Sequence, residues 1–219
     1  MQTGPLAFRL VIFDFDGTLV DSAGWMIRTL NDIAGQFGLR RVSEEEVRML
    51  RGRSNTDIVR YLGVPLWKLP RIATEMRRRI AADIAQFKLF AGVEDMLRTL
   101  DERGLQLAIV SSNSEDNVRR VLGAASAARI DTFECSAAMF GKARKLKAVM
   151  QRLRTEASTT LYVGDETRDI EAAREVRVAS GAVTWGYANA DILATFAPTL
   201  TFDSFADIVA LVKNDDAVR

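Results

Sequence analysis

Residues 11–19 read Val-Ile-Phe-Asp-Phe-Asp-Gly-Thr-Leu, an apolar run that leads directly into two carboxylates, a glycine and a hydroxyl. The apolar residues predict a buried strand over 9–14, and Gly17 predicts the turn that ends it. Asp14 and Asp16 share one side of an extended segment, so their charges repel unless a cation, a proton or the turn geometry separates them. A divalent metal ion is the natural partner, although an ordinary strand followed by an Asp-Gly turn carries the same residues.

Composition describes an ordinary globular protein. The chain has 219 residues, of which 48% are hydrophobic, enough for one sizeable domain or two modest ones. Its formal net charge is +1, so nothing global indicates a nucleic-acid or membrane partner. No apolar run is long enough to span a bilayer, and Met1–Ala7 lacks the cationic and apolar pattern of a signal segment. We therefore expect a soluble protein of the cytoplasm.

The absence of histidine limits which catalytic mechanisms and metal sites are possible. Without histidine, Ser-His-Asp catalysis, Cys-His catalysis and histidine-ligated zinc are all excluded. The single cysteine, Cys135, excludes an internal disulfide. Carboxylate and lysine chemistry remain, together with a hard cation such as magnesium held by oxygen ligands.

The rest of the chain divides into a helical region and a region of alternating strands and helices. The helical region is predicted to contain helices over 21–37, 44–51, 55–62 and 71–85. Beyond it, apolar runs predict strands over 105–110, 160–163 and 178–184, and amphipathic patterns predict helices over 92–103, 115–122, 143–154, 167–176 and 204–213. Such alternation is typical of a parallel sheet covered on both faces. The helical region is therefore an insertion after the first strand of that sheet.

Three further segments place polar residues at the ends of predicted strands or helices. Residues 107–113, Leu-Ala-Ile-Val-Ser-Ser-Asn, end a strand in hydroxyls, which could hold phosphate oxygens or form a Ser-Asn turn that caps a helix. Residues 160–169, Thr-Leu-Tyr-Val-Gly-Asp-Glu-Thr-Arg-Asp, end a strand in Asp165 and place Asp169 about one helical turn further on. These acids could face a metal site or simply complement the helix dipole. Residues 140–143, Phe-Gly-Lys-Ala, place a lysine at a helix start.

Together with residues 11–19, these segments resemble the four motifs of the haloacid dehalogenase superfamily, in particular its phosphoglycolate-phosphatase-like members with a helical cap. The resemblance covers nearly the whole chain. It implies a Rossmann-like α/β fold, a doubly wound parallel sheet with strand order 5-4-1-2-3. The α/β core would comprise residues 1–19 and 88–219, and the helical cap residues 20–87. Strands one and four would be neighbours, with their acids at the ligand-binding edge.

The resemblance also implies roles for the acids. Asp14 would attack phosphorus and form an aspartyl phosphate, while Asp16 would protonate the leaving alcohol and later activate water. Mg²⁺ would be held by the Asp14 carboxylate, the Asp16 carbonyl oxygen and Asp165. Asp169 would orient the active-site lysine or a metal-bound water. Thr18 would hydrogen-bond near Asp16 in the phosphate site, or only form the turn.

For the phosphate-binding hydroxyl and for the active-site lysine, the sequence offers more than one candidate. Ser111 is the expected phosphate-binding hydroxyl, with Ser112 beside it. Lys142 is the expected active-site lysine, although Ala143 stands where many relatives have proline, and Lys145 and Lys147 compete for the role.

Substrate choice would belong to the cap. From 21 to 85 it carries twelve Lys and Arg against eight Asp and Glu, a balance that suits a small anionic substrate. In the loop over 51–55, Arg53 is the candidate substrate-binding residue, with a plain interhelical turn as the alternative. The expected activity is hydrolysis of a small phosphorylated metabolite by a monomer or homodimer. A β-phosphoglucomutase-like enzyme is the main alternative, disfavoured because such relatives tend to carry valine or alanine where Thr18 stands; a haloacid dehalogenase and a non-catalytic binding module are weaker ones.

Overall fold

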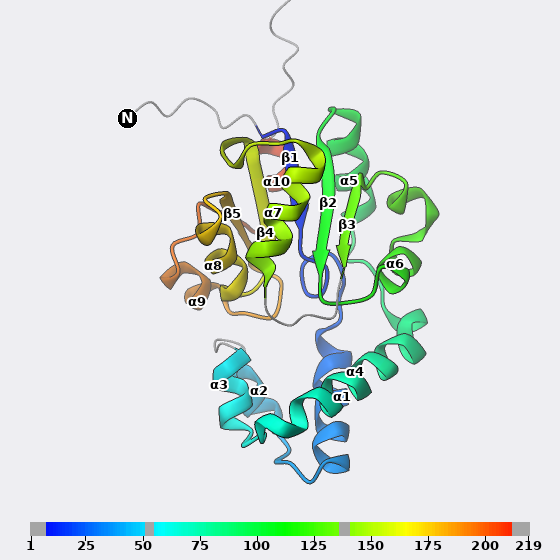
Figure 1. Cartoon of the computed structure of the whole chain (residues 1–219), viewed down its shortest axis with the longest axis vertical. Helices are drawn as coiled ribbons and strands as arrows, with labels where there is room; N and C mark the ends of the chain where they lie inside the picture. Colours follow the sequence, from blue (N-terminus) through cyan, green and yellow to red (C-terminus); the bar gives the residue numbers. More distant parts are fainter. Residues whose placement is uncertain (1–7, 51–54, 136–140, 212–219) are drawn as a thin grey trace, which may run out of the picture.

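A computed structural model of the chain describes residues 8–50, 55–135 and 141–211. Its centre is one parallel sheet flanked by helices on both faces (Figure 1). The strands are β1 (Leu10–Phe13), β2 (Gln106–Ser111), β3 (Thr132–Cys135), β4 (Thr160–Gly164), β5 (Ala179–Val183) and β6 (Leu200–Phe202). Their order, β3-β2-β1-β4-β5-β6, confirms the expected five-strand order and adds β6 beside β5.

Strand β1 lies at the middle of the sheet because all four of its residues are buried and apolar. Side chains alternate between the faces of a strand, so Val11 and Phe13 join the core cluster that contains residues of α5 (Val93–Glu102) and α10 (Phe205–Leu211). Leu10 and Ile12 join the cluster that contains residues of α7 (Lys142–Leu153) and α8 (Thr167–Glu175). Because both faces of β1 are buried, the strand has a fixed orientation in the sheet. The acids that follow it therefore lie at the carboxyl edge of the sheet.

The helices of the insertion lie together beyond the carboxyl ends of the strands (Figure 1). They are α1 (Ala23–Gln36), α2 (Glu44–Leu50), α3 (Asn55–Tyr61) and α4 (Leu69–Asp83), with 3-10 turns at Leu66–Lys68 and Ile84–Gln86. The chain enters and leaves this group through adjacent segments, because Val20 and Leu89 form an antiparallel bridge. The amide of Phe90 also donates to the carbonyl of Leu19, at 3.0 Å.

Besides short 3-10 turns, the strands β3 and β6 and the helix α9 (Ala190–Thr195) were not predicted from the sequence. Strands β3 and β6 are the edges of the sheet, and each has one partner strand and few buried residues, so neither shows a long apolar run. The helix predicted over 115–122 extends as α6 (Glu115–Ala127), across Gly123, whose φ of 73° is not helical. The other predicted elements agree with the observed bounds to within two residues. Among the described residues, no helix is long and apolar enough to cross a membrane.

Candidate active site

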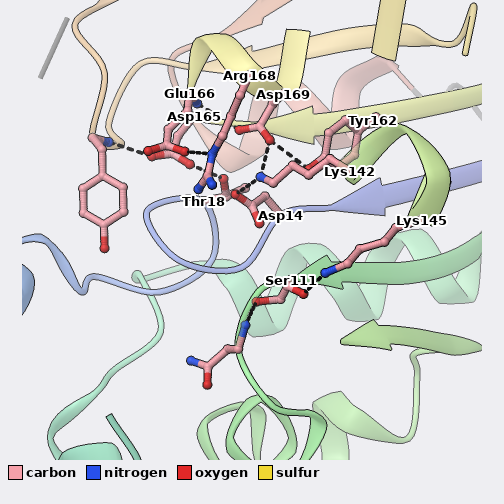
Figure 2. Close-up of polar contacts among 12 residues, drawn as sticks. Asp14, Thr18, Ser111, Lys142, Lys145, Tyr162, Asp165, Glu166, Arg168 and Asp169 are labelled. Atoms are coloured by element: carbon pink, nitrogen blue, oxygen red, sulfur yellow. Dashed lines mark hydrogen bonds and ion pairs between the residues drawn. The ribbon is translucent and has the colours of Figure 1, made fainter. Parts of the chain in front are cut away.

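The acids that follow β1 and β4 meet at one edge of the sheet. The two strands pair in register, with Phe13 opposite Val163, and the amide of Asp14 donates to the carbonyl of Val163 at 2.8 Å. Asp14 and Asp165 therefore leave the sheet at nearly the same level, and Asp169 reaches the same place from the first turn of α8 (Figure 2). Carboxylate oxygens of Asp14, Asp165 and Asp169 all lie within 4.8 Å of one another. The expected meeting of Asp14 and Asp165 is thus observed, and the third carboxylate side chain of the group is Asp169 rather than Asp16.

Asp165 is held by hydrogen bonds and by close backbone packing. Thr18 Oγ1 donates to its Oδ1 at 3.0 Å, and the amide of Tyr187 donates to its Oδ2 at 2.7 Å. A Cβ at Gly17 would lie 2.2 Å from Asp165 Oδ2, and a Cβ at Gly186 would lie 2.1 Å from Asp165 Cβ. Both positions therefore require glycine. The Thr18 hydroxyl contacts Asp165, a contact that suits a positioning group.

Lys142 is the lysine that reaches the carboxylates (Figure 2). It is the first residue of α7, and its Nζ lies 2.7 Å from Asp14 Oδ2 and also forms an ion pair with Asp169. Tyr162 Oη donates to the same Asp169 carboxylate at 2.9 Å. Lys145 instead donates to the carbonyl of Ser111 at 2.6 Å, and Lys147 is exposed.

Burial and neighbouring charges shift the titration of these acids. Burial raises the pKa of Asp14, with Lys142 opposing the shift. Burial, followed by the charge of Glu166 and of Asp14, raises the pKa of Asp165 well above its usual value. Burial and the Asp14 charge raise the pKa of Asp16 to about 6. Burial opposes ionisation of Asp169 too, but Lys142 and Arg168 outweigh it and lower its pKa.

Strand β2, which ends in the hydroxyls, lies on the other side of β1 from β4, the strand that leads into α8. Ser111 is 1% exposed, and its Oγ accepts a hydrogen bond from the amide of Asn113 at 3.0 Å. Ser112 is exposed and lines the cavity beside the carboxylates. Both hydroxyls therefore remain candidates for binding phosphate, Ser111 at the strand end and Ser112 at the cavity wall.

Similarity to known proteins assigns the family. The sequence profile described as haloacid dehalogenase-like hydrolase matches residues 11–183. The chain belongs to this family. A phosphoglycolate phosphatase of Synechococcus elongatus is 34% identical to this hydrolase over 205 residues, covering 93% of the chain and 97% of that protein. Pyrophosphatase PpaX of Oceanobacillus iheyensis is 25% identical over 217 residues, covering 97% of the chain and 100% of that protein. A solved haloacid dehalogenase-like family hydrolase from Streptococcus pneumoniae shares the fold with a TM-score of 0.80 at 19% identity, covering 94% of the chain and 99% of that structure.

The donor set of this hydrolase fits a hard divalent cation. Arg168, three residues after Asp165 in the sequence, forms an ion pair with Glu166 beside the carboxylates. The cluster then holds four acids, Asp14, Asp165, Glu166 and Asp169, and two cations, Lys142 and Arg168. Because the acids exceed the cations by two charges and offer only oxygen ligands, a cation of the magnesium type matches both the charge and the ligand chemistry. Asp14 and Asp165 of the acidic triad would hold such an ion, while Asp169 is paired with Lys142.

Two functional candidates of the hydrolase had no role assigned from the sequence, although Asn113 belongs to the segment 107–113. Tyr187 lies in the loop after β5, and its hydroxyl lies 2.5 Å from Ser22 Oγ, which in turn donates to Asp16 Oδ1 at 3.2 Å. Asn113 is 6% exposed, and its Nδ2 has no hydrogen-bond partner among the described residues. The predicted substrate residue Arg53 belongs to residues 51–54, which lie outside the described part of the chain.

Proposed function

We propose that this hydrolase is a magnesium-dependent phosphomonoesterase that acts on a small phosphorylated metabolite through an aspartyl-phosphate intermediate. The observation that carries the proposal is the Asp14 carboxylate, 4% exposed at the end of β1 and 2.7 Å from Lys142 Nζ, within the acidic triad. Family membership and relatives named as phosphatases agree with it. A cytoplasmic location and the choice between monomer and homodimer stay predictions from the sequence.

Asp14 supplies the nucleophile in this mechanism. One of its carboxylate oxygens attacks phosphorus, and the bond from phosphorus to the ester oxygen breaks. Asp16 lines the cavity beside this point and is oriented by Ser22, so it can give the leaving alcohol its proton. Asp16 then accepts a proton from the water that hydrolyses the aspartyl phosphate, which restores both carboxyl groups.

Lys142 lets a nucleophilic carboxylate approach an anionic phosphoryl group. Its ammonium lies between Asp14 and Asp169, where it offsets negative charge and can donate to a phosphoryl oxygen. Ser111 or Ser112 would donate to another oxygen from the end of β2. Magnesium, when bound by Asp14, Asp165 and the Asp16 carbonyl oxygen, would supply charge neutralisation for the transferring group, with Asp169 orienting Lys142.

Residues 20–87 would act as a cap over a core formed by residues 1–19 and 88–219. This division is supported by the bridge between Val20 and Leu89, since the chain enters and leaves the helical group at one place. The arrangement suits a cap that selects the substrate while the strand ends carry out the chemistry. Arg53 stays a predicted contributor to that selection.

The test of the proposal is phosphate release from a panel of phosphomonoesters, including phosphoglycolate, with magnesium or with EDTA. Asp14→Asn should abolish release while the melting temperature and circular dichroism stay close to wild type. Asp21→Asn, an exposed acid nearby, is the matched control and should keep full activity. Turnover by Asp14→Asn near the wild-type rate, or full activity in EDTA, would contradict the mechanism. A sugar phosphate isomerised without free phosphate would support the mutase instead.

A further inference from the structure

A cavity that reaches Asp16 and Glu166, beside the carboxylate triad, continues into the interior of the helical group. Its volume is about 460 Å³, and its walls include Asp16, Asn113 and Arg168 at the sheet edge. From there it extends along residues of α1, α2, α3 and α4. Cavities of roughly 300–1,000 Å³ are typical of sites that bind drug-sized ligands, so the space exceeds the needs of a two-carbon phospho-acid.

The wall formed by the helices is apolar. Met26 and Leu30 of α1 face it at a spacing of four, and Ile72 and Met76 of α4 face it at the same spacing, so one face of each helix is turned to the cavity. None of the described side chains of α4 is fully buried, although its apolar face is well defined. These four side chains of α1 and α4 are only half-buried, whereas Ile33 and Leu50, which line the same cavity, are buried.

The polar exceptions in the helical wall are engaged by neighbours. Arg40 forms an ion pair with Glu46, and Arg77 donates to Thr74 Oγ1 at 3.0 Å. These two arginine side chains therefore already have partners within the protein. Most of the remaining wall consists of hydrocarbon side chains. Such a surface gains free energy when apolar ligand atoms displace water from it.

The opposite end of the cavity is built for an oxygen-rich group. Asn113 is nine-tenths buried and lines the cavity, and its Nδ2 is a donor that no described residue uses. A buried donor without a partner is unfavourable unless a ligand or water accepts from it. The cavity is thus polar at the catalytic carboxylates and apolar beyond them.

We infer that the preferred substrate of this enzyme is an amphiphilic phosphomonoester, with the phosphate at the carboxylates and an alkyl or aromatic group between α1 and α4. The inference rests on the proposed phosphatase function and adds the substrate class to it. A two-carbon phospho-acid would occupy the polar end and leave the apolar wall in contact with water.

The experiment is a series of primary alkyl phosphates from ethyl to octyl, assayed with magnesium for released phosphate alongside phosphoglycolate. Each added methylene that leaves water should raise kcat/KM about fourfold until the cavity is filled. Ile72→Trp should reduce the ratio of octyl to ethyl phosphate hydrolysis at least tenfold by filling the apolar end. Arg71→Trp makes the same change at an exposed neighbour on α4 and should leave that ratio unchanged.

Leu30→Trp on α1 provides a second variant if Ile72→Trp does not fold, and thermal melts establish folding for each. A flat alkyl series, with phosphoglycolate the best substrate, would overturn the inference and leave the phosphatase intact. An equal loss of the ratio in Arg71→Trp would also overturn it, because the effect would not come from the cavity. Release from no substrate at all would overturn the proposed function, and the inference with it.

Discussion

Replacing Gly17 with alanine tests how closely the turn after β1 packs against Asp165 of the acidic triad. Gly17 has a φ of +79°, a region that disfavours residues with a Cβ. Gly104, in the turn before β2, has nearly the same φ, +78°, but a Cβ there would meet nothing within 4 Å. Alanine at either position carries a backbone cost of about 1–2 kcal/mol. Gly104→Ala is therefore a matched control for that cost.

Only the Gly17 variant adds a steric collision. Its Cβ would lie 2.2 Å from Asp165 Oδ2 and 2.9 Å from Tyr187 Cδ2. Asp165 cannot move aside easily, because its oxygens accept hydrogen bonds from Thr18 and from the amide of Tyr187. Overpacking of this kind costs about 1–3 kcal/mol. Together with the backbone cost, Gly17→Ala should lose about 2–5 kcal/mol of unfolding free energy, against about 1–2 kcal/mol for Gly104→Ala.

Thermal and urea unfolding of the two variants measure this difference directly. At about 2–4 °C per kcal/mol for a chain of this size, Gly104→Ala should melt about 2–8 °C below wild type. The Gly17 variant should melt lower still and also release phosphate more slowly, since Asp165 is displaced. Equal losses of stability in the two variants would refute the reasoning, because the collision with Asp165 would then contribute nothing.

Three further experiments test Lys142, the hydroxyl beside Asp16 and the burial of Cys135. Lys142→Met should lower kcat about 10²–10³-fold by removing a charge that stabilises the transition state. Lys147→Met, at an exposed position of the same helix, is the control and should stay active. Similar rates for the two variants would contradict the assignment of Lys142 as the active-site lysine. Ser22→Ala should lower kcat about 2- to 10-fold through the loss of its hydrogen bond to Asp16, and unchanged kcat would remove Ser22 from that role. Burial raises the pKa of Cys135 to about 12, so at pH 8 iodoacetamide should alkylate the native thiol about 10³-fold more slowly than the unfolded one. The unfolded chain gives up this proton first, so Cys135 should reduce stability as pH rises from about 9 towards 12, and equal alkylation rates would contradict the burial.

Much of the fold could be predicted because the central strands can be recognised from their own residues. Strands β1, β2 and β4 are buried apolar runs that each end in polar residues, and that pattern is local in sequence. The edge strands β3 and β6 have four and three residues, and their pairing with β2 and β5 defines them more than their composition does. A pattern of residues alone could not supply that long-range pairing.

In the candidate site, too, the features that follow from local sequence patterns could be predicted, and those that depend on the turn and helix geometry could not. Asp14 and Asp165 could be placed together because parallel neighbours deliver their next residues to one edge. Asp16 is not a member of the triad, because β1 ends at Phe13 and the turn at Gly17 follows, but beyond burial the charge of Asp14 still helps to raise the pKa of Asp16, as expected for neighbouring acids. Asp169 joins Asp14 instead, because α8 begins at Thr167 and a capping box with Glu166 turns its carboxylate back towards the strand end.

Substrate choice depends on features that strand-end motifs do not contain. Two relatives, each similar to the chain along almost its whole length, carry different names, phosphoglycolate phosphatase and pyrophosphatase. In the proposed mechanism the groups at the strand ends act on any phosphomonoester, so discrimination must come from the cavity wall that α1 and α4 provide. Substitutions at Asp14 or Lys142 should therefore lower hydrolysis of all substrates together. Substitutions at Ile72 should change their ranking, and a uniform loss there would place Ile72 in the catalytic apparatus instead.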